Sequence, residues 1–144
     1  MEREEMDRKR KEQWIEAWFS IEAFAFGKET VEGALKDHME RLGRAKDVAV
    51  YRTSLGETVA VDVGDKKGFS QIAEASLFAK DLFTLFNIIM VYGPSAVEIL
   101  GPSRKEITID ELQTMANTLA GVVHQFAAAG AGGIVISPGK QGYS

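Results

Sequence analysis

Two glutamates in apolar surroundings are the residues of this sequence best suited to chemistry. Glu22 and Glu74 each lie in a segment that predicts a strand, residues 13–26 and 69–80. Two carboxylates that face each other across a sheet can act as a general acid and base, or can bind a divalent cation through their oxygens. The pair therefore raises the hypothesis of a carboxylate-based or divalent-metal-dependent enzyme, which stands as the alternative to a binding domain.

The other residue types offer little catalytic machinery. The sequence has no cysteine and two histidines, which excludes disulfides, thiolate ligands and a cysteine nucleophile and disfavours a histidine metal site within one chain. His38 lies on the apolar stripe of a predicted helix, where we expect a packed histidine bonded to the backbone. The sequence predicts no cofactor and no metal, and it assigns no catalytic residue.

Two glycine-rich runs resemble phosphate-binding loops in composition but not in order. Residues 64–68 place two lysines between glycines, yet they lead into a strand and not into a helix. In residues 127–133 a helix precedes the glycines, whereas a dinucleotide fingerprint runs from strand to glycines to helix. We expect the first run to be a mobile connection and the second to release the chain into a last short strand at residues 134–136.

Composition limits the classes of partner. With 144 residues, of which 45% are apolar and 26% charged, the chain has the length and composition of one globular domain. A formal charge of −4 disfavours nucleic acid as a partner. The first residues carry both signs of charge where a signal peptide needs an apolar run, and the helix that begins at Leu82 is too short to cross a bilayer. We expect a cytoplasmic protein with no membrane contact.

Residues 81–102 predict a helix, a sharp stop and a strand. Asp81 is a residue type that caps helix starts, and apolar residues recur behind it at helical spacing. Gly93 followed by proline predicts the helix end, and residues 96–100 predict a short strand. Residues 69–80 fit a helix or a strand, and we favour the strand because it leaves Asp81 free to act as a cap.

The remaining segments have simpler patterns. Residues 28–42 predict a helix with Gly43 as a left-handed cap, and residues 48–53 and 58–63 predict strands. Thr108 and Glu111 have the spacing of a capping box, in which each side chain satisfies a free amide of the other. The helix after it extends to Ala127 and repeats apolar residues at steps of three and four, the pattern of a narrow packing seam.

The order of these elements predicts the fold class. Strand, helix, strand, strand, helix, strand is the split βαβ order of a ferredoxin-like sandwich, an α+β fold with an antiparallel sheet and helices on one face. An added helix and short strand follow at the C-terminus. We expect a charged N-terminal arm at residues 1–12, one ferredoxin-like α+β domain at residues 13–138 and a tail at residues 139–144.

A family resemblance supports the same fold. Residues 86–102, above all YGPSAVEILGP followed by a helix, resemble the helix, glycine turn and strand near the end of the C-terminal extension domain of WYL-type transcriptional regulators. The run is also similar to archaeal conserved proteins of unknown function. The resemblance implies a ferredoxin-like domain and a regulatory role, although Gly101 stands where the regulator pattern prefers an acid.

The first strand divides into two registers, which predicts an open sheet face. One register is wholly apolar and should face the helices, so the other faces outward with aromatic and acidic residues. The expected members of the open face are Trp14, Glu16, Trp18, Glu22, Phe24, Phe26, Tyr51, Ile72, Glu74, Phe78 and Glu98. Large apolar side chains gathered on a free surface mark a contact, and like charges on paired strands call for a cation or a basic partner.

Three hypotheses follow for the open face. The leading one is self-association, in which this face or the seam of the last helix packs on another copy, with Arg52, Lys80 or Arg104 meeting the glutamates. The second is a sensing or regulatory module that holds a small amine between aromatic walls. The third is the carboxylate enzyme. The residues predicted to bind the ligand or form the interface are Trp18, Glu22, Tyr51, Glu74 and Glu98.

Overall fold

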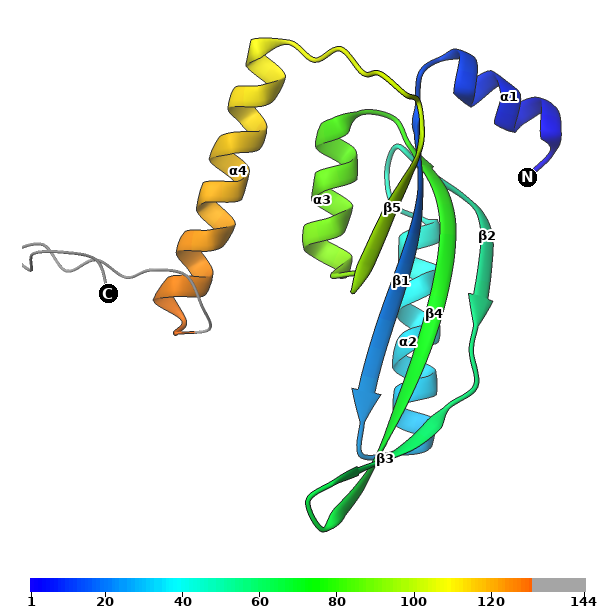
Figure 1. Ribbon diagram of the computed structural model, residues 1–144, viewed down its shortest axis with the longest axis vertical. Helices are drawn as coiled ribbons and strands as arrows, with labels where there is room; N and C mark the ends of the chain where they lie inside the picture. The colour runs from blue at the N-terminus through cyan, green and yellow to red at the C-terminus, as the bar shows by residue number, and fades with distance from the viewer. Residues whose placement is uncertain (131–144) are drawn as a thin grey trace, which may run out of the picture. The chain divides into compact units, whose positions relative to one another are not determined.

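The chain divides into two units. The computed structural model describes residues 1–130 (Figure 1). The first unit covers residues 1–105 and contains all the strands of the described chain, and the second begins at residue 106. The strand predicted at residues 134–136 lies outside the described residues. No helix within residues 1–130 is both long and apolar enough to cross a bilayer.

The observed elements follow the predicted order closely. The first unit consists of α1 (Arg3–Lys11), β1 (Ile15–Ala25), α2 (Lys28–Gly43), β2 (Val48–Leu55), β3 (Val59–Val63), β4 (Lys66–Ala79), α3 (Leu82–Tyr92) and β5 (Ala96–Gly101). The second unit contains α4 (Ile109–Ala128). Residues 69–80, which fitted helix or strand, lie almost wholly within strand β4, as favoured from the sequence.

The strands form an open antiparallel sheet. Its order is β2-β4-β1-β5, and β3 pairs with the part of β4 that extends past β2. The predicted central strand is confirmed, because β1 pairs with β4 on one side and with β5 on the other. Together β2 and β3 line one edge of β4. The β3–β4 hairpin projects past the end of α2 in Figure 1.

The hydrophobic core lies between one face of the sheet and helices α2 and α3. The apolar register of β1 is buried as predicted, with Ala17 and Phe19 wholly inaccessible to solvent. The helices contribute Leu35, Leu42 and Leu85 to the same core cluster. Because buried strand residues alternate with exposed ones, the opposite face of the sheet is the open face expected from the sequence.

The helix starts confirm two predicted caps. The Asp81 side chain accepts a hydrogen bond from the Thr84 amide at 2.8 Å, and Gly93 ends α3 in the left-handed conformation with a φ of 58°. At α4, the Thr108 hydroxyl accepts from the Glu111 amide at 3.1 Å. This is one of the two bonds of the predicted capping box.

Two details of the sequence prediction are wrong. Gly43 is the last residue of α2 and not its left-handed cap, because the following Arg44 ends the helix with a φ of −105°. Residues 64–68 were predicted to be a mobile connection, yet most of them belong to strand β4. Gly64 and Asp65 alone form a tight hairpin turn, and Lys66 already pairs with Val63 in the sheet. Only Gly64 needs a positive φ, 65°, which suits a two-residue hairpin turn.

Candidate interface on the open face of the sheet

The open face has a polar cluster at its α1 end. The Arg10 guanidinium donates to both carboxylate oxygens of Glu16, at 3.0 and 3.2 Å. The Tyr51 hydroxyl donates to the same carboxylate at 2.6 Å. Tyr51 reaches this face by the alternation of β2, and the bulge between Val50 and Arg52 places Arg52, opposite Ser76, on the same face. One carboxylate therefore joins α1, β1 and β2.

Charge and burial shift the pKa values in this cluster. The hydrogen bonds from Arg10 lower the pKa of the Glu16 carboxyl below its ordinary value, although partial burial opposes them. Partial burial, and then the bond to Glu16, raise the pKa of Tyr51 above its ordinary value. Glu16 is therefore held as an anion and Tyr51 as a neutral donor at neutral pH.

Phe78 corrects the predicted composition of the open face. The sequence places Phe78 there as an available aromatic residue, yet its side chain is fully buried. The Tyr51 ring lies 5.2 Å from the Phe78 ring, and the Arg10 guanidinium lies 5.6 Å from it. The Nζ atom of Lys9 likewise lies over the Trp14 ring, 3.9 Å from its centroid. Basic residues of α1 therefore cover this end of the face.

The centre of the open face holds a small hollow. Trp18 donates from its indole nitrogen to Glu74 at 3.1 Å, and the Ser54 hydroxyl lies 3.5 Å from the other oxygen of that carboxylate. With Arg52 and Ser76, these residues line a cavity of about 160 Å³. The hollow offers one cation, one anion and an aromatic wall within a space suited to a small polar group.

The five predicted site residues fall into three places. Trp18 and Glu74 bond directly, and Glu98 of β5 lies opposite Trp18 in the sheet. Tyr51 belongs to the polar cluster with Glu16. Glu22 accepts a hydrogen bond from the Ser70 hydroxyl at 3.1 Å.

Glu22 and Glu74 are neighbours on the diagonal and not a facing pair. In the register of β1 and β4, Glu22 lies opposite Ile72, and Glu74 lies opposite Ser20. Each carboxylate has its own donors. Within residues 1–130 no three His, Cys, Asp or Glu side chains gather in a way that could hold a metal ion.

The far end of the open face carries an apolar surface, which we call the hairpin patch. Five of its six side chains point to the same face and the sixth, Phe26, packs on Phe24 just past the end of β1. Each of the six is between 37% and 58% exposed: Phe24, Phe26, Val59, Val61, Val63 and Ile72. The rings of Phe24 and Phe26 pack edge to face, with centroids 5.2 Å apart. Lys66 and the Glu22–Ser70 pair border this patch.

The three valines of the hairpin patch were missed by the sequence analysis. The run from Val59 to Val63 reads V-A-V-D-V, so a strand places all three valines on one face. This alternation can be read from the sequence alone. The sequence does not reveal that β3 pairs with β4, and this pairing places the three valines on the same face as Phe24 and Ile72.

His38 is confirmed as a packed histidine. Its Nε2 atom lies 2.8 Å from the backbone carbonyl oxygen of Tyr92, and the two rings pack edge to face. The bond links α2 to the end of α3. His38 therefore acts in the structure of the helix layer and not as part of the open face.

Comparison with known proteins places the chain in a family. A family model described as the MJ0538 family matches residues 16–138. Because the match covers well over half of the chain, the chain belongs to the MJ0538 family. No curated protein and no solved structure shows a significant match. The archaeal-named family agrees with the similarity to archaeal conserved proteins, and the comparisons give no support to the resemblance to WYL-type regulators.

Proposed function

We propose that this member of the MJ0538 family is a self-associating cytoplasmic domain whose open sheet face binds a second copy of the chain. One observation above all supports this proposal. The hairpin patch gathers six large apolar side chains on one free surface, each more than a third exposed. Contiguous apolar surface of this kind marks a contact site on a protein.

The charges around the patch suit pairing between identical surfaces. The open face carries Arg52 and Lys66 as well as Glu22, Glu74 and Glu98. In a two-fold interface each patch meets its own copy, so a face with both signs can place cations against anions. Lys66 already lies 5.6 Å from the Phe26 ring, at the border of the apolar surface.

We also assign the first unit to the ferredoxin-like class. The strand order β5-β1-β4-β2 and the antiparallel pairing support this assignment, with β2 and β3 acting as one broken edge strand. Such a sandwich packs its core helices, here α2 and α3, on one face, and α1 contacts the open face only at the end that carries Glu16. The rest of the open face is then available for a partner without any rearrangement of the core.

A charge placed in the hairpin patch tests the proposal. Phe26→Glu and Val61→Glu put a carboxylate into the expected contact, so each should lower the mass of the assembly in light scattering. Val91→Glu is the matched control, because Val91 is 62% exposed on α3, away from this face. Unchanged mass in both patch variants would overturn the proposal.

A second candidate function is binding of a small amine as a sensing or regulatory module. The hollow between Trp18, Arg52 and Glu74 favours it, because a carboxylate beside an indole ring can hold a cation. A thermal shift screen with amine metabolites should show stabilisation that Glu74→Gln removes. Metals in the same screen, with Glu22→Gln beside Glu74→Gln, test the alternative of a carboxylate-based or metal-dependent enzyme.

A further inference from the structure

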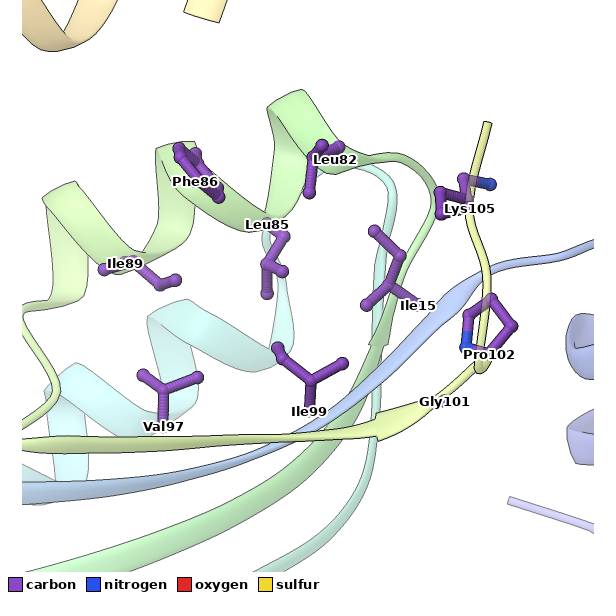
Figure 2. A pocket seen from close by; sticks show the side chains of 10 residues that line it. All are labelled: Ile15, Leu82, Leu85, Phe86, Ile89, Val97, Ile99, Gly101, Pro102 and Lys105. Carbon is purple, nitrogen blue, oxygen red and sulfur yellow. The ribbon is translucent and has the colours of Figure 1, made fainter. Parts of the chain in front are cut away.

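An apolar groove lies on the helix side of the first unit, between α3 and β5. Figure 2 shows the side chains of α3 above it and those of β5 below it. The groove has a volume of about 340 Å³, and its walls are formed mainly by Leu82, Leu85, Phe86, Ile89, Val97 and Ile99. A cavity of this size is within the range of known binding sites.

The groove exists because the helix layer does not cover β5. Val97 and Ile99 pair with core residues of β1 and point to the helix side, yet they are 38% and 51% exposed. Helix α3 has eleven residues, about 16 Å in length, and buries Leu85 and Ile88 in the core. The edge strand is therefore left with an apolar side that no element of the first unit fills.

The second unit presents a helix with an exposed apolar stripe, a surface that can fill an apolar groove. Helix α4 carries an apolar stripe, and five of its side chains are between 47% and 78% exposed: Ile109, Leu112, Leu119, Val123 and Phe126. Met115 borders this stripe and is buried. The five exposed side chains recur at the spacing of one helix face, the arrangement that binds apolar grooves. The first turn of α4 is acidic, with Asp110 and Glu111.

We propose that α4 of one copy binds in the α3–β5 groove of a second copy, and that the exchange is reciprocal. The apolar stripe matches the apolar walls of the groove. Among the described residues that line the groove, Lys105 alone is charged, and it lies at one end, where the acidic first turn of α4 would meet it. Its Nζ atom donates to the Gln13 carbonyl at 2.6 Å and has two further donors.

The length of α4 favours a second copy as the occupant. Twenty residues make a helix of about 30 Å, roughly twice the length of α3. One groove therefore covers only about half of the apolar stripe. In a reciprocal pair the two α4 helices run past each other, so that their C-terminal halves cover one another. This contact is separate from the hairpin patch, so the two interfaces can fail independently.

Engineered cysteines test the exchange, since the natural chain has none. We would co-express Phe86→Cys with a tagged Leu112→Cys chain and oxidise the mixture mildly. The expected product is a disulfide-linked dimer that contains one tagged and one untagged chain. Val91→Cys replaces Phe86→Cys as the control and should give no such dimer, because Val91 does not line the groove.

Two outcomes would overturn the exchange. A chain that carries both Phe86→Cys and Leu112→Cys is oxidised in parallel. The first outcome is a disulfide within this single chain and none between the two singly substituted chains, which would mean that α4 binds the groove of its own chain. The second is no disulfide in either case. Phe86 and Leu112 are 37% and 48% exposed, so both substitutions should leave the melting temperature close to that of the natural chain.

The number of chains in the assembly gives an independent test. If the axes of the two proposed two-fold contacts are perpendicular, the assembly closes as a tetramer. The natural protein should then assemble as four chains. The Leu112→Glu and Phe26→Glu variants should each assemble as two chains, and the double variant should be a single chain. A Leu112→Glu assembly as large as the natural one would overturn the exchange. An ineffective Phe26→Glu would overturn only the role of the hairpin patch.

Discussion

Glu16 shows how one side chain positions a whole element. Its carboxylate accepts hydrogen bonds from Arg10 of α1 and Tyr51 of β2, and its own backbone lies in β1. Helix α1 has no buried residue of its own. The attachment of α1 to the open face therefore depends on Glu16 together with the contacts that Lys9 and Arg10 make with aromatic rings.

This attachment should weaken in acid. Because the folded pKa of Glu16 lies below its unfolded value, its contribution to stability is present above the unfolded pKa and is lost as pH falls through the folded pKa. At neutral pH, Glu16→Gln should lower the free energy of unfolding by roughly 0.5–1 kcal/mol, the upper range for a surface ion pair. Urea unfolding from neutral to strongly acidic pH should show the two proteins converging in acid.

Glu57→Gln serves as the control for this experiment, since Glu57 is exposed between β2 and β3. It should follow the natural chain at every pH. A constant difference between Glu16→Gln and the natural chain across the whole titration would contradict the account of α1.

The sequence predicted that the five proposed site residues lie on the open face of the sheet, but it did not predict their hydrogen-bond partners. Trp18 and Glu74 both alternate outward, as predicted, yet their direct bond depends on the register of two strands more than fifty residues apart. A shift of register changes every opposed pair. For the same reason the sequence proposed Glu22 and Glu74 as a carboxylate pair without fixing their spacing, and the register places them on a diagonal.

At the scale of elements, a single glycine allows the edge of the sheet to break into β2 and β3. The Gly56 amide donates to the Ile72 carbonyl at 2.8 Å, and the Gln71 side chain donates to the Gly56 carbonyl at 2.9 Å. A Cβ atom at Gly56 would lie 2.9 Å from the Ile72 carbonyl oxygen. This backbone contact leaves no room for a side chain.

Gly56→Ala should therefore destabilise the protein by about 1–3 kcal/mol, as other overpacked sites do. Gly33→Ala is the matched control, because nothing lies within 4 Å of its added Cβ and the residue is helical. That change should stabilise by roughly 0.5–1 kcal/mol. Equal unfolding midpoints in urea for the two variants would contradict the tight edge contact.

Helices and strands were predicted well where local chemistry marks their ends. Asp81 and Gly93 define α3 through hydrogen bonds within a few residues, so the sequence alone was sufficient. Residues 64–68 were predicted to be a mobile connection because their lysines and glycines are typical of a solvated loop. The strand character of this run comes from pairing with Val63 and Val61, which composition does not reveal.

At the scale of the whole molecule, the order of elements predicted an antiparallel sheet with helices on one face. It also predicted the open sheet face, but it did not predict that the valines of β3 join that face or that β5 keeps an uncovered apolar side. These two surfaces depend on the length of α3 and on how far the β3–β4 hairpin extends past β2, which follow from geometry more than from residue type. The hairpin patch and the α3–β5 groove are both products of these lengths.

Self-association is the central claim, and sedimentation equilibrium of the unmodified protein over a wide concentration range tests it most directly. The account predicts a mass of at least two chains at the higher concentrations. The mass of a single 15.8 kDa chain at every concentration would contradict it.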